Sequence, residues 1–319
     1  MSERSISRRG FLRAAVAAGS MAAAGSAGAA GRSGRRMTID LVCGNLGVSA
    51  DLPTAVKLAM DHGFESVAPD AGFLGKLSDS QLAELVENMK AHNLVWGASG
   101  LAVEFRADEG TFRAGMQKLP TFADALKRAG ASRVGTWISP THGRLPYVAN
   151  FRRHAGRLRE VASVLGDRGI RFGLEYVGPK TSWTASRYPF IHTMGEMREL
   201  IAEIDRKNVG LVLDSWHWYT AGETPAEIRS LTNADVVACD LNDAPRSVPV
   251  DQQRDPVREL PASTGVIDVK GFLSALSAIG YDGPVRAEPF NAALRTLPPA
   301  EAVAATARAM KRAFATLEG

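Results

Sequence analysis

The sequence predicts a single (β/α)8 TIM barrel, in which a closed ring of parallel strands is surrounded by helices. From Thr38 onward, short apolar runs alternate with longer segments of helical periodicity, and eight such pairs follow one another. The apolar runs contain few alternating polar residues, which is typical of parallel strands covered on both faces. The length of 319 residues suits one such barrel after a short leader.

The expected strands are rich in Val, Ile, Leu and Phe. Their ranges are Thr38–Cys43, Phe64–Ala68, Leu94–Ala98, Arg133–Ile138, Arg171–Val177, Val209–Ser215, Val236–Leu241 and Val285–Pro289. Amphipathic helices are expected at Leu52–His62, Ser80–His92, Phe112–Ala129, Ala149–Asp167, Met194–Asp205, Val269–Ile279 and Ala300–Leu317. A short helix is expected after Thr224-Pro225, and turn residues such as Gly63 and Gly280 end several of the others.

A doubly wound open sheet is the alternative architecture. Such sheets usually carry a glycine-rich phosphate loop after their first strand. Here that position reads Cys43-Gly44-Asn45-Leu46-Gly47, which lacks the fingerprint. The barrel is therefore favoured. The long polar loop from Asn242 to Gly265 follows the seventh strand, on the face where barrel active sites form, and it is a candidate lid.

The first residues predict where the chain is sent in the cell. Ser7-Arg8-Arg9-Gly10-Phe11-Leu12-Arg13, followed by an Ala/Gly-rich stretch, resembles a twin-arginine export signal, and a disordered basic tail is the alternative. We therefore expect a signal and linker over residues 1–36 and the barrel over residues 37–319. The protein is expected in the periplasm, or otherwise exported by the twin-arginine pathway.

The composition excludes some partners. The formal charge is +4, but residues 1–30 hold four arginines against Glu3, so the rest of the chain is near +1. This balance does not indicate binding to nucleic acid or to an anionic membrane surface. No stretch is expected to span a membrane. Cys43 and Cys239 lie in apolar runs and are expected to be buried free thiols, with a disulfide as the alternative.

Four acidic residues lie near the carboxyl ends of predicted strands five to eight: Glu175, Asp214, Asp240 and Glu288. A carboxylate at the end of an apolar strand is costly to desolvate unless it is paired or coordinated. Four of them would meet at the carboxyl-terminal mouth of one barrel and repel each other. A shared divalent cation resolves this repulsion, although separate structural roles are the alternative.

Six motifs around these positions carry a family resemblance. They are Gly173-Leu174-Glu175, Leu213-Asp214-Ser215-Trp216-His217, Leu241-Asn242-Asp243-Ala244-Pro245-Arg246, Gly265-Val266-Ile267-Asp268, Gly280-Tyr281-Asp282-Gly283-Pro284-Val285 and Glu288-Pro289-Phe290. From about Thr38 to Leu317 the chain resembles the xylose-isomerase-like sugar phosphate isomerase/epimerase superfamily. The resemblance implies one divalent metal held by Glu175, Asp214, Asp240 and Glu288, with His217 and Arg246 contacting substrate.

Two positions depart from the pattern of that superfamily. Asp240 stands where the family has His or Gln, and Pro261-Ala262-Ser263-Thr264-Gly265 replaces a Pro-Gly-x-Gly turn. An all-carboxylate ligand set favours Mn2+ or Mg2+ over Zn2+. The expected cofactor is therefore one Mn2+ or Mg2+ ion.

The expected reaction is isomerisation or epimerisation of a small carbohydrate. The cation would polarise a carbonyl and stabilise an enediolate, while Glu175 and Glu288 remove and return the carbon-bound proton, as in the resembling epimerases. The alternative at the same site is a lyase or dehydratase that cleaves an oxidised (3-oxo) sugar or glycoside by β-elimination.

Two other side chains are weaker candidates for substrate contact: Trp216, which could equally be packing, and His142, which follows the fourth strand. A non-catalytic sugar-binding barrel and a His-rich, three-metal hydrolase are further alternatives. The hydrolase is disfavoured because the six histidines do not gather at strand ends. The sequence leaves open whether the chain forms a homo-oligomer.

Overall fold

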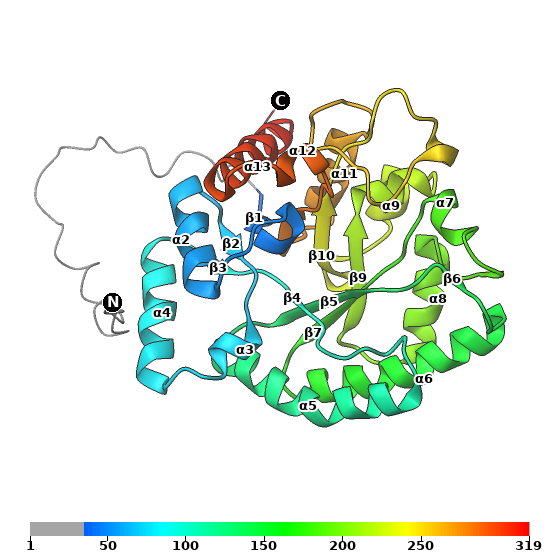
Figure 1. Ribbon diagram of the computed structural model, residues 1–319, viewed down its shortest axis with the longest axis horizontal. Coiled ribbons are helices and arrows are strands. Elements are labelled where there is room, and N and C mark those ends of the chain that lie inside the picture. The colour runs from blue at the N-terminus through cyan, green and yellow to red at the C-terminus, as the bar shows by residue number, and fades with distance from the viewer. Residues whose placement is uncertain (1–34, 319) are drawn as a thin grey trace, which may run out of the picture. The chain divides into compact units, whose positions relative to one another are not determined.

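The computed structural model describes residues 35–318 (Figure 1). The predicted export signal lies outside the described residues and stays a prediction. Arg35, expected in the linker, belongs to the folded body. Its guanidinium lies 2.8 Å from Glu65 and stacks 4.6 Å from the centre of the Phe314 ring.

Every expected strand is present, and all pairings in the main sheet are parallel. The strands of this sheet are β1 (Thr38–Leu41), β2 (Ser66–Val67), β3 (Val95–Trp96), β4 (Ser99–Gly100), β5 (Arg133–Trp137), β7 (Arg171–Glu175), β9 (Val209–Asp214), β10 (Val236–Leu241) and β11 (Pro284–Ala287). A separate antiparallel pair is formed by β6 (Thr141–His142) and β8 (Tyr188–Pro189). The expected bounds are therefore close to the observed ones, although most observed strands are at least one residue shorter than expected.

The order of the strands closes the sheet into a barrel. It runs β3-β2-β1-β11-β10-β9-β7-β5-β4. Of its two ends, β3 lies within the third expected strand, and β4 follows directly after the last residue expected there. Only residues 97–98 separate them, and β3 pairs with β2 while β4 pairs with β5. The sheet therefore returns to its starting point, and the predicted (β/α)8 barrel is confirmed.

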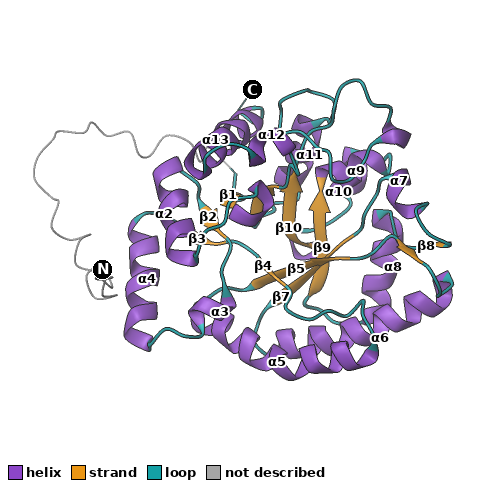
Figure 2. Cartoon of the chain, viewed as in Figure 1, coloured by secondary structure: helices purple, strands orange, loops and turns teal. Residues whose placement is uncertain are grey.

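Helices surround the strands (Figure 2). They are α2 (Leu52–His62), α3 (Ala71–Leu74), α4 (Asp79–Ala91), α5 (Glu109–Arg128), α6 (Tyr147–Gly166), α7 (Lys180–Trp183), α8 (Met194–Ile204), α9 (Ser215–Thr220), α10 (Pro225–Arg229), α11 (Val269–Ala278), α12 (Ala292–Arg295) and α13 (Pro299–Ala315). The 3-10 helices are η1 (Cys43–Leu46), η2 (Asn233–Asp235) and η3 (Val250–Gln252). Side-chain caps fix several starts: Ser78 and Gln81 form a capping box on α4, as Thr193 and Glu196 do on α8.

Cys43 and Cys239 are buried free thiols, as expected. Among the described residues, no helix combines the length and the apolar character that crossing a bilayer requires.

Asp40 is a buried carboxylate inside the barrel that the sequence analysis did not single out. It is 1% exposed, and neither of its side-chain oxygens has a hydrogen-bond partner among the described residues. A Cβ atom on residue 97 would lie 2.3 Å from Asp40 Oδ1, so glycine at the break between β3 and β4 leaves room for this carboxyl group. Burial raises the pKa of Asp40 to about 6, although the nearby Arg286 opposes the shift.

The raised pKa of Asp40 makes stability depend on pH. Because the folded pKa of about 6 exceeds the usual value of 3.8, the folded state binds this proton more tightly than the unfolded state, and stability falls as the pH rises from 3.8 to about 6. We expect Asp40→Asn to stabilise the protein, relative to wild type, by about 1 kcal/mol more at pH 7.5 than at pH 5. Urea unfolding at both pH values measures this difference. The exposed Asp79→Asn variant provides the baseline, and an Asp40→Asn effect that is equal at the two pH values contradicts the account.

Candidate functional site

The strand register brings charged residues to one level of the barrel. Asp240 on β10 pairs with Asp214 on β9 and with Arg286 on β11, and Arg286 in turn pairs with Asp40 on β1. In parallel pairs, partners at one level point to the same side of the sheet. Four charged side chains on four successive strands therefore share one layer.

Asp214 is held by donors on both of its oxygens. Its side chain caps α9, since Oδ1 accepts from the backbone N–H of Trp216 at 2.8 Å and from Nδ2 of Asn242 at 3.0 Å. Oδ2 accepts from Nη1 of Arg258 at 2.7 Å. Burial raises the pKa of Asp214, and Arg258 opposes that rise. The carboxylate is fully buried, so each of these bonds counters a desolvation cost.

Arg258 lies at the centre of the acidic cluster, although the sequence analysis assigned it no role. It comes from the long loop after β10, and its side chain is 1% exposed. Nη1 lies 2.7 Å from Asp214 and 3.2 Å from Glu288 Oε2, and Nη2 lies 2.6 Å from Asp255. Burial alone would lower its pKa, but the three carboxylates raise it, so the guanidinium stays charged.

Asp240 is engaged by a second arginine. Arg286 donates to both of its oxygens, from Nε at 2.6 Å and from Nη2 at 3.0 Å, which is a bidentate pair. Burial raises the pKa of Asp240, and Arg286 opposes the rise. The carboxylate that stands at the third ligand position of the resembling family therefore has an internal counter-ion.

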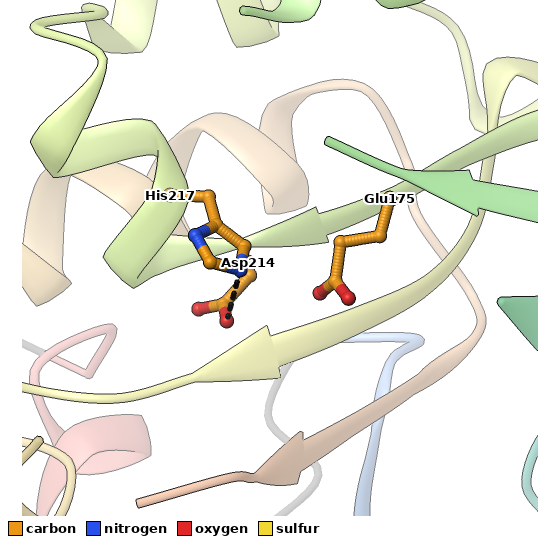
Figure 3. Close-up of side chains that lie close together, drawn as sticks. All are labelled: Glu175, Asp214 and His217. Carbon is orange, nitrogen blue, oxygen red and sulfur yellow. Dashed lines mark ion pairs between the residues drawn. The ribbon is translucent and has the colours of Figure 1, made fainter. Parts of the chain in front are cut away.

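Glu175, Asp214 and His217 form the group best placed to hold a metal ion (Figure 3). Each offers one ligand atom, and these atoms all lie within 4.8 Å of one another. Glu175 Oε1 is buried and has no hydrogen-bond partner among the described residues. Burial raises the pKa of Glu175 well above its usual range, and Glu288, Asp240 and Asp214 add to the shift. An unpartnered buried carboxylate oxygen needs either a proton or a cation.

His217 lies between the backbone of Gly178 and the charged side chains of Asp214 and Arg258. It is 2% exposed, its Nδ1 lies 3.3 Å from the backbone N–H of Gly178, and its Nε2 lies 3.7 Å from Asp214. A Cβ atom on residue 178 would lie 2.4 Å from the carbonyl oxygen of His217, so only glycine lets the chain pass there. Burial lowers the pKa of His217 to about 3, and Arg258 adds to the shift. The imidazole is therefore neutral at physiological pH, as a metal ligand must be. Its Nε2 can bind a cation in the tautomer that carries the proton on Nδ1, in which Gly178 no longer donates to the ring.

Glu288 follows β11 and is less enclosed. Its backbone N–H donates to Asn242 at 3.0 Å, and its side chain is 18% exposed. Burial and then Asp240 raise its pKa to about 8, with Arg258 opposing. Glu288 is therefore mainly protonated at neutral pH and can exchange a proton there.

The other predicted substrate contacts lie in different surroundings. Trp216 is 0% exposed and packs in the core with Arg258 5.5 Å from its ring centre. Arg246 is exposed and donates to the carbonyl of Thr264 within its own loop. His142 lies on β6, and its Nδ1 accepts from the backbone N–H groups of Arg144 and Leu145. Substrate contact by these three residues stays a prediction.

The four predicted ligands thus gather in one cluster, but their partners differ. Glu175 and Asp214 belong to the group that can share a cation, together with His217, which the resemblance assigned to substrate. Asp240 and Glu288 lie outside that group, and each contacts an arginine, as Asp214 also does. The four-carboxylate ligand set therefore stays a prediction, and the described geometry favours a set of two carboxylates and one imidazole.

Sequence analysis missed both arginines. Arg286 interrupts the apolar run Val285-Arg286-Ala287, and a charged residue inside a predicted buried strand is a signal that could have found it. Arg258 gives no such signal, because its position in the site depends on how the loop before it folds back. A backbone bridge between Asp243 and Glu259 holds the loop in that path. The bridge joins residues far apart in the sequence, so local sequence patterns do not predict it.

Comparisons with known proteins agree with this architecture. The sequence model of the family described as "Xylose isomerase-like TIM barrel" matches residues 56–313. The solved structure of a xylose isomerase domain protein from Alicyclobacillus acidocaldarius superposes with a TM-score of 0.73 at 29% identity, covering 86% of this chain and 97% of that one.

Two curated relatives are enzymes. The inosose isomerase of Bacillus velezensis is 23% identical over 249 residues, which cover 76% of this chain and 85% of that enzyme. The 3-dehydroshikimate dehydratase of Pseudomonas aeruginosa is 30% identical over 145 residues, but these cover only 45% of this chain and 22% of that enzyme.

The Asp240–Arg286 pair can be tested by a double-mutant cycle. Arg286→Met leaves Asp240 buried without its counter-ion, and we expect a loss of about 3–5 kcal/mol in the free energy of unfolding. Asp240→Asn in the same chain removes the stranded charge, so the double variant should regain much of that loss. Denaturant unfolding of the four proteins measures the coupling. Strictly additive effects would show that the pair does not interact as described.

Proposed function

This chain belongs to the xylose isomerase-like TIM barrel family, and we propose that it is a metal-dependent isomerase or epimerase of a small sugar-like substrate. The observation that carries the proposal is the buried Glu175 Oε1, which lacks a partner and lies in one group with ligand atoms of Asp214 and His217. The inosose isomerase among the relatives supports the substrate class.

The residues present fit a divalent cation. Glu175, Asp214 and His217 would hold it, and Mn2+ is the proposed ion because it accepts both carboxylate and imidazole ligands. When bound, the cation would polarise a substrate carbonyl and offset the negative charge that develops on its oxygen. Three protein ligands leave coordination positions free for substrate oxygens.

The chain's own carboxyl groups would move the proton. Glu288, with its pKa of about 8, changes protonation near neutral pH, and Glu175 has a raised pKa as well. They come from β7 and from the segment after β11, on different sides of the Asp214 strand in the sheet order. One can remove a proton from carbon while the other returns it, in the manner of paired acid–base groups.

A dehydratase is the second candidate. The stretch of 30% identity to 3-dehydroshikimate dehydratase favours it. The same proton removal would then be followed by loss of hydroxide from the next carbon, and that leaving group needs a proton. Glu288, whose pKa is raised to about 8, can supply it.

Metal content tests the proposed ligands. We expect Glu175→Gln and Asp214→Asn to lose most of the Mn2+ that wild type retains after purification, because each variant removes a charged ligand. Glu84→Gln, on the exposed face of α4, should retain it. Elemental analysis of the mature proteins measures the ion. Chelator should also lower the melting temperature of wild type, because it leaves the acidic cluster unbalanced. Equal metal content in all four proteins would remove the basis for this site.

Products formed in deuterated water separate the two reactions. We expect a ketose or inosose to return as its isomer or epimer with deuterium at the carbon next to the carbonyl, because the proton passes through an exchangeable acid. NMR detects the label and the new stereocentre. Loss of water from 3-dehydroshikimate or a related keto compound, with a new carbon–carbon double bond in the product, would favour the dehydratase. Binding of these compounds without exchange or turnover would instead identify a non-catalytic sugar-binding barrel.

A further inference from the structure

Arg258 contacts the atoms that a cation would need. Trp216 and Asn242 both donate to Asp214 Oδ1, so Oδ2 is the oxygen left for a metal ion. Arg258 Nη1 lies 2.7 Å from that oxygen. Nη2 of the same guanidinium lies 3.4 Å from His217 Nε2, the nitrogen that faces Asp214. Two of the three ligand residues of the proposed metal site therefore face Arg258.

A guanidinium and a divalent cation cannot both take these positions without repulsion. Two positive charges a few ångströms apart in a buried cluster repel each other much more strongly than they would in bulk water. Arg258 is 1% exposed and charged, so it already supplies positive charge to Asp214 and to Glu288 Oε2, 3.2 Å away. The proposed cation would supply the same charge to the same carboxylates.

Other groups can hold Arg258 when it leaves these atoms. Asp255, three residues earlier in the same loop, contacts Nη2 at 2.6 Å, and its backbone carbonyl accepts from Nε at 3.0 Å. The guanidinium also lies 4.7 Å from the centre of the Phe290 ring, in cation–π geometry. Asp255 is itself 31% exposed, so the pair reaches toward solvent. If Arg258 shifted toward Asp255, its charge would therefore keep a carboxylate partner.

We propose that Arg258 is a tethered counter-ion that occupies the ligand atoms of Asp214 and His217 and gives them up when a divalent cation binds. This inference rests on the proposed metal site. It follows that metal affinity is reduced by the fraction of molecules in which Arg258 still holds those atoms. Metal binding and the position of the loop that carries Arg258 are then linked equilibria, each of which shifts the other.

Replacement of Arg258 by a neutral side chain of similar length tests the inference. We compare Arg258→Met with Arg254→Met, an exposed arginine of the same loop, and with wild type. Mn2+ is titrated into each metal-free protein and followed by calorimetry. We expect Arg258→Met to bind Mn2+ at least about tenfold more tightly than wild type, because no competitor must be displaced. Arg254→Met should bind as wild type does.

Melting temperatures give a second readout. Metal-free Arg258→Met should melt below metal-free wild type, because its carboxylates lose a counter-ion, and saturating Mn2+ should close most of that gap. If Arg258→Met does not fold without metal, Arg258→Lys replaces it, since a single ammonium reaches fewer of these atoms and should raise the affinity less. Unchanged or weaker Mn2+ binding by the folded variants overturns the role of Arg258 alone. Absence of Mn2+ binding by wild type and variants overturns the proposed metal site as well.

Discussion

Carboxylates buried at the mouth of one barrel can coexist only if positive charge lies among them. Five acids share this cluster with two arginines, and if all were ionised the excess would be three negative charges, five minus two. The acids are Glu175, Asp214, Asp240, Asp255 and Glu288, and the arginines are Arg258 and Arg286. Burial is the main cause of the raised pKa values of Glu175, Asp214, Asp240 and Glu288, and neighbouring carboxylates add to each of them. Protons can absorb this excess, and the divalent cation proposed above would offset two of the three charges.

The barrel creates this constraint through its strand register. Parallel strands end at the same face, so residues of β9, β10 and β11 that are far apart in sequence meet at one level. The loop after β10 then folds back through its bridge between Asp243 and Glu259 and inserts Arg258 into the cluster. What the sequence indicated as a polar lid is, at Arg258, a buried part of the site. The neutral His217 completes the group that can hold a metal, with Gly178 making room beside it.

Local sequence patterns were enough to predict the barrel, the free thiols and the positions of the four carboxylates. Apolar runs and helix caps depend on neighbours in the chain, and parallel strands share one carboxyl-terminal edge in any barrel. The partners of those carboxylates were not predictable in the same way. Asp240 was expected as a ligand, and its bidentate pair with Arg286 depends on the exact register of β10 and β11. The position of Arg258 depends on the fold of a 24-residue loop, and no periodic pattern in the sequence predicts how that loop folds.

Anomalous scattering from a crystal of the protein soaked in Mn2+ tests the central claim most directly. The account predicts one strong peak in contact with Glu175, Asp214 and His217, with the guanidinium of Arg258 moved off Asp214 Oδ2. A crystal with no peak at this cluster, while Arg258 stays on Asp214, would contradict it. In that case the two arginines and bound protons alone would balance the buried carboxylates.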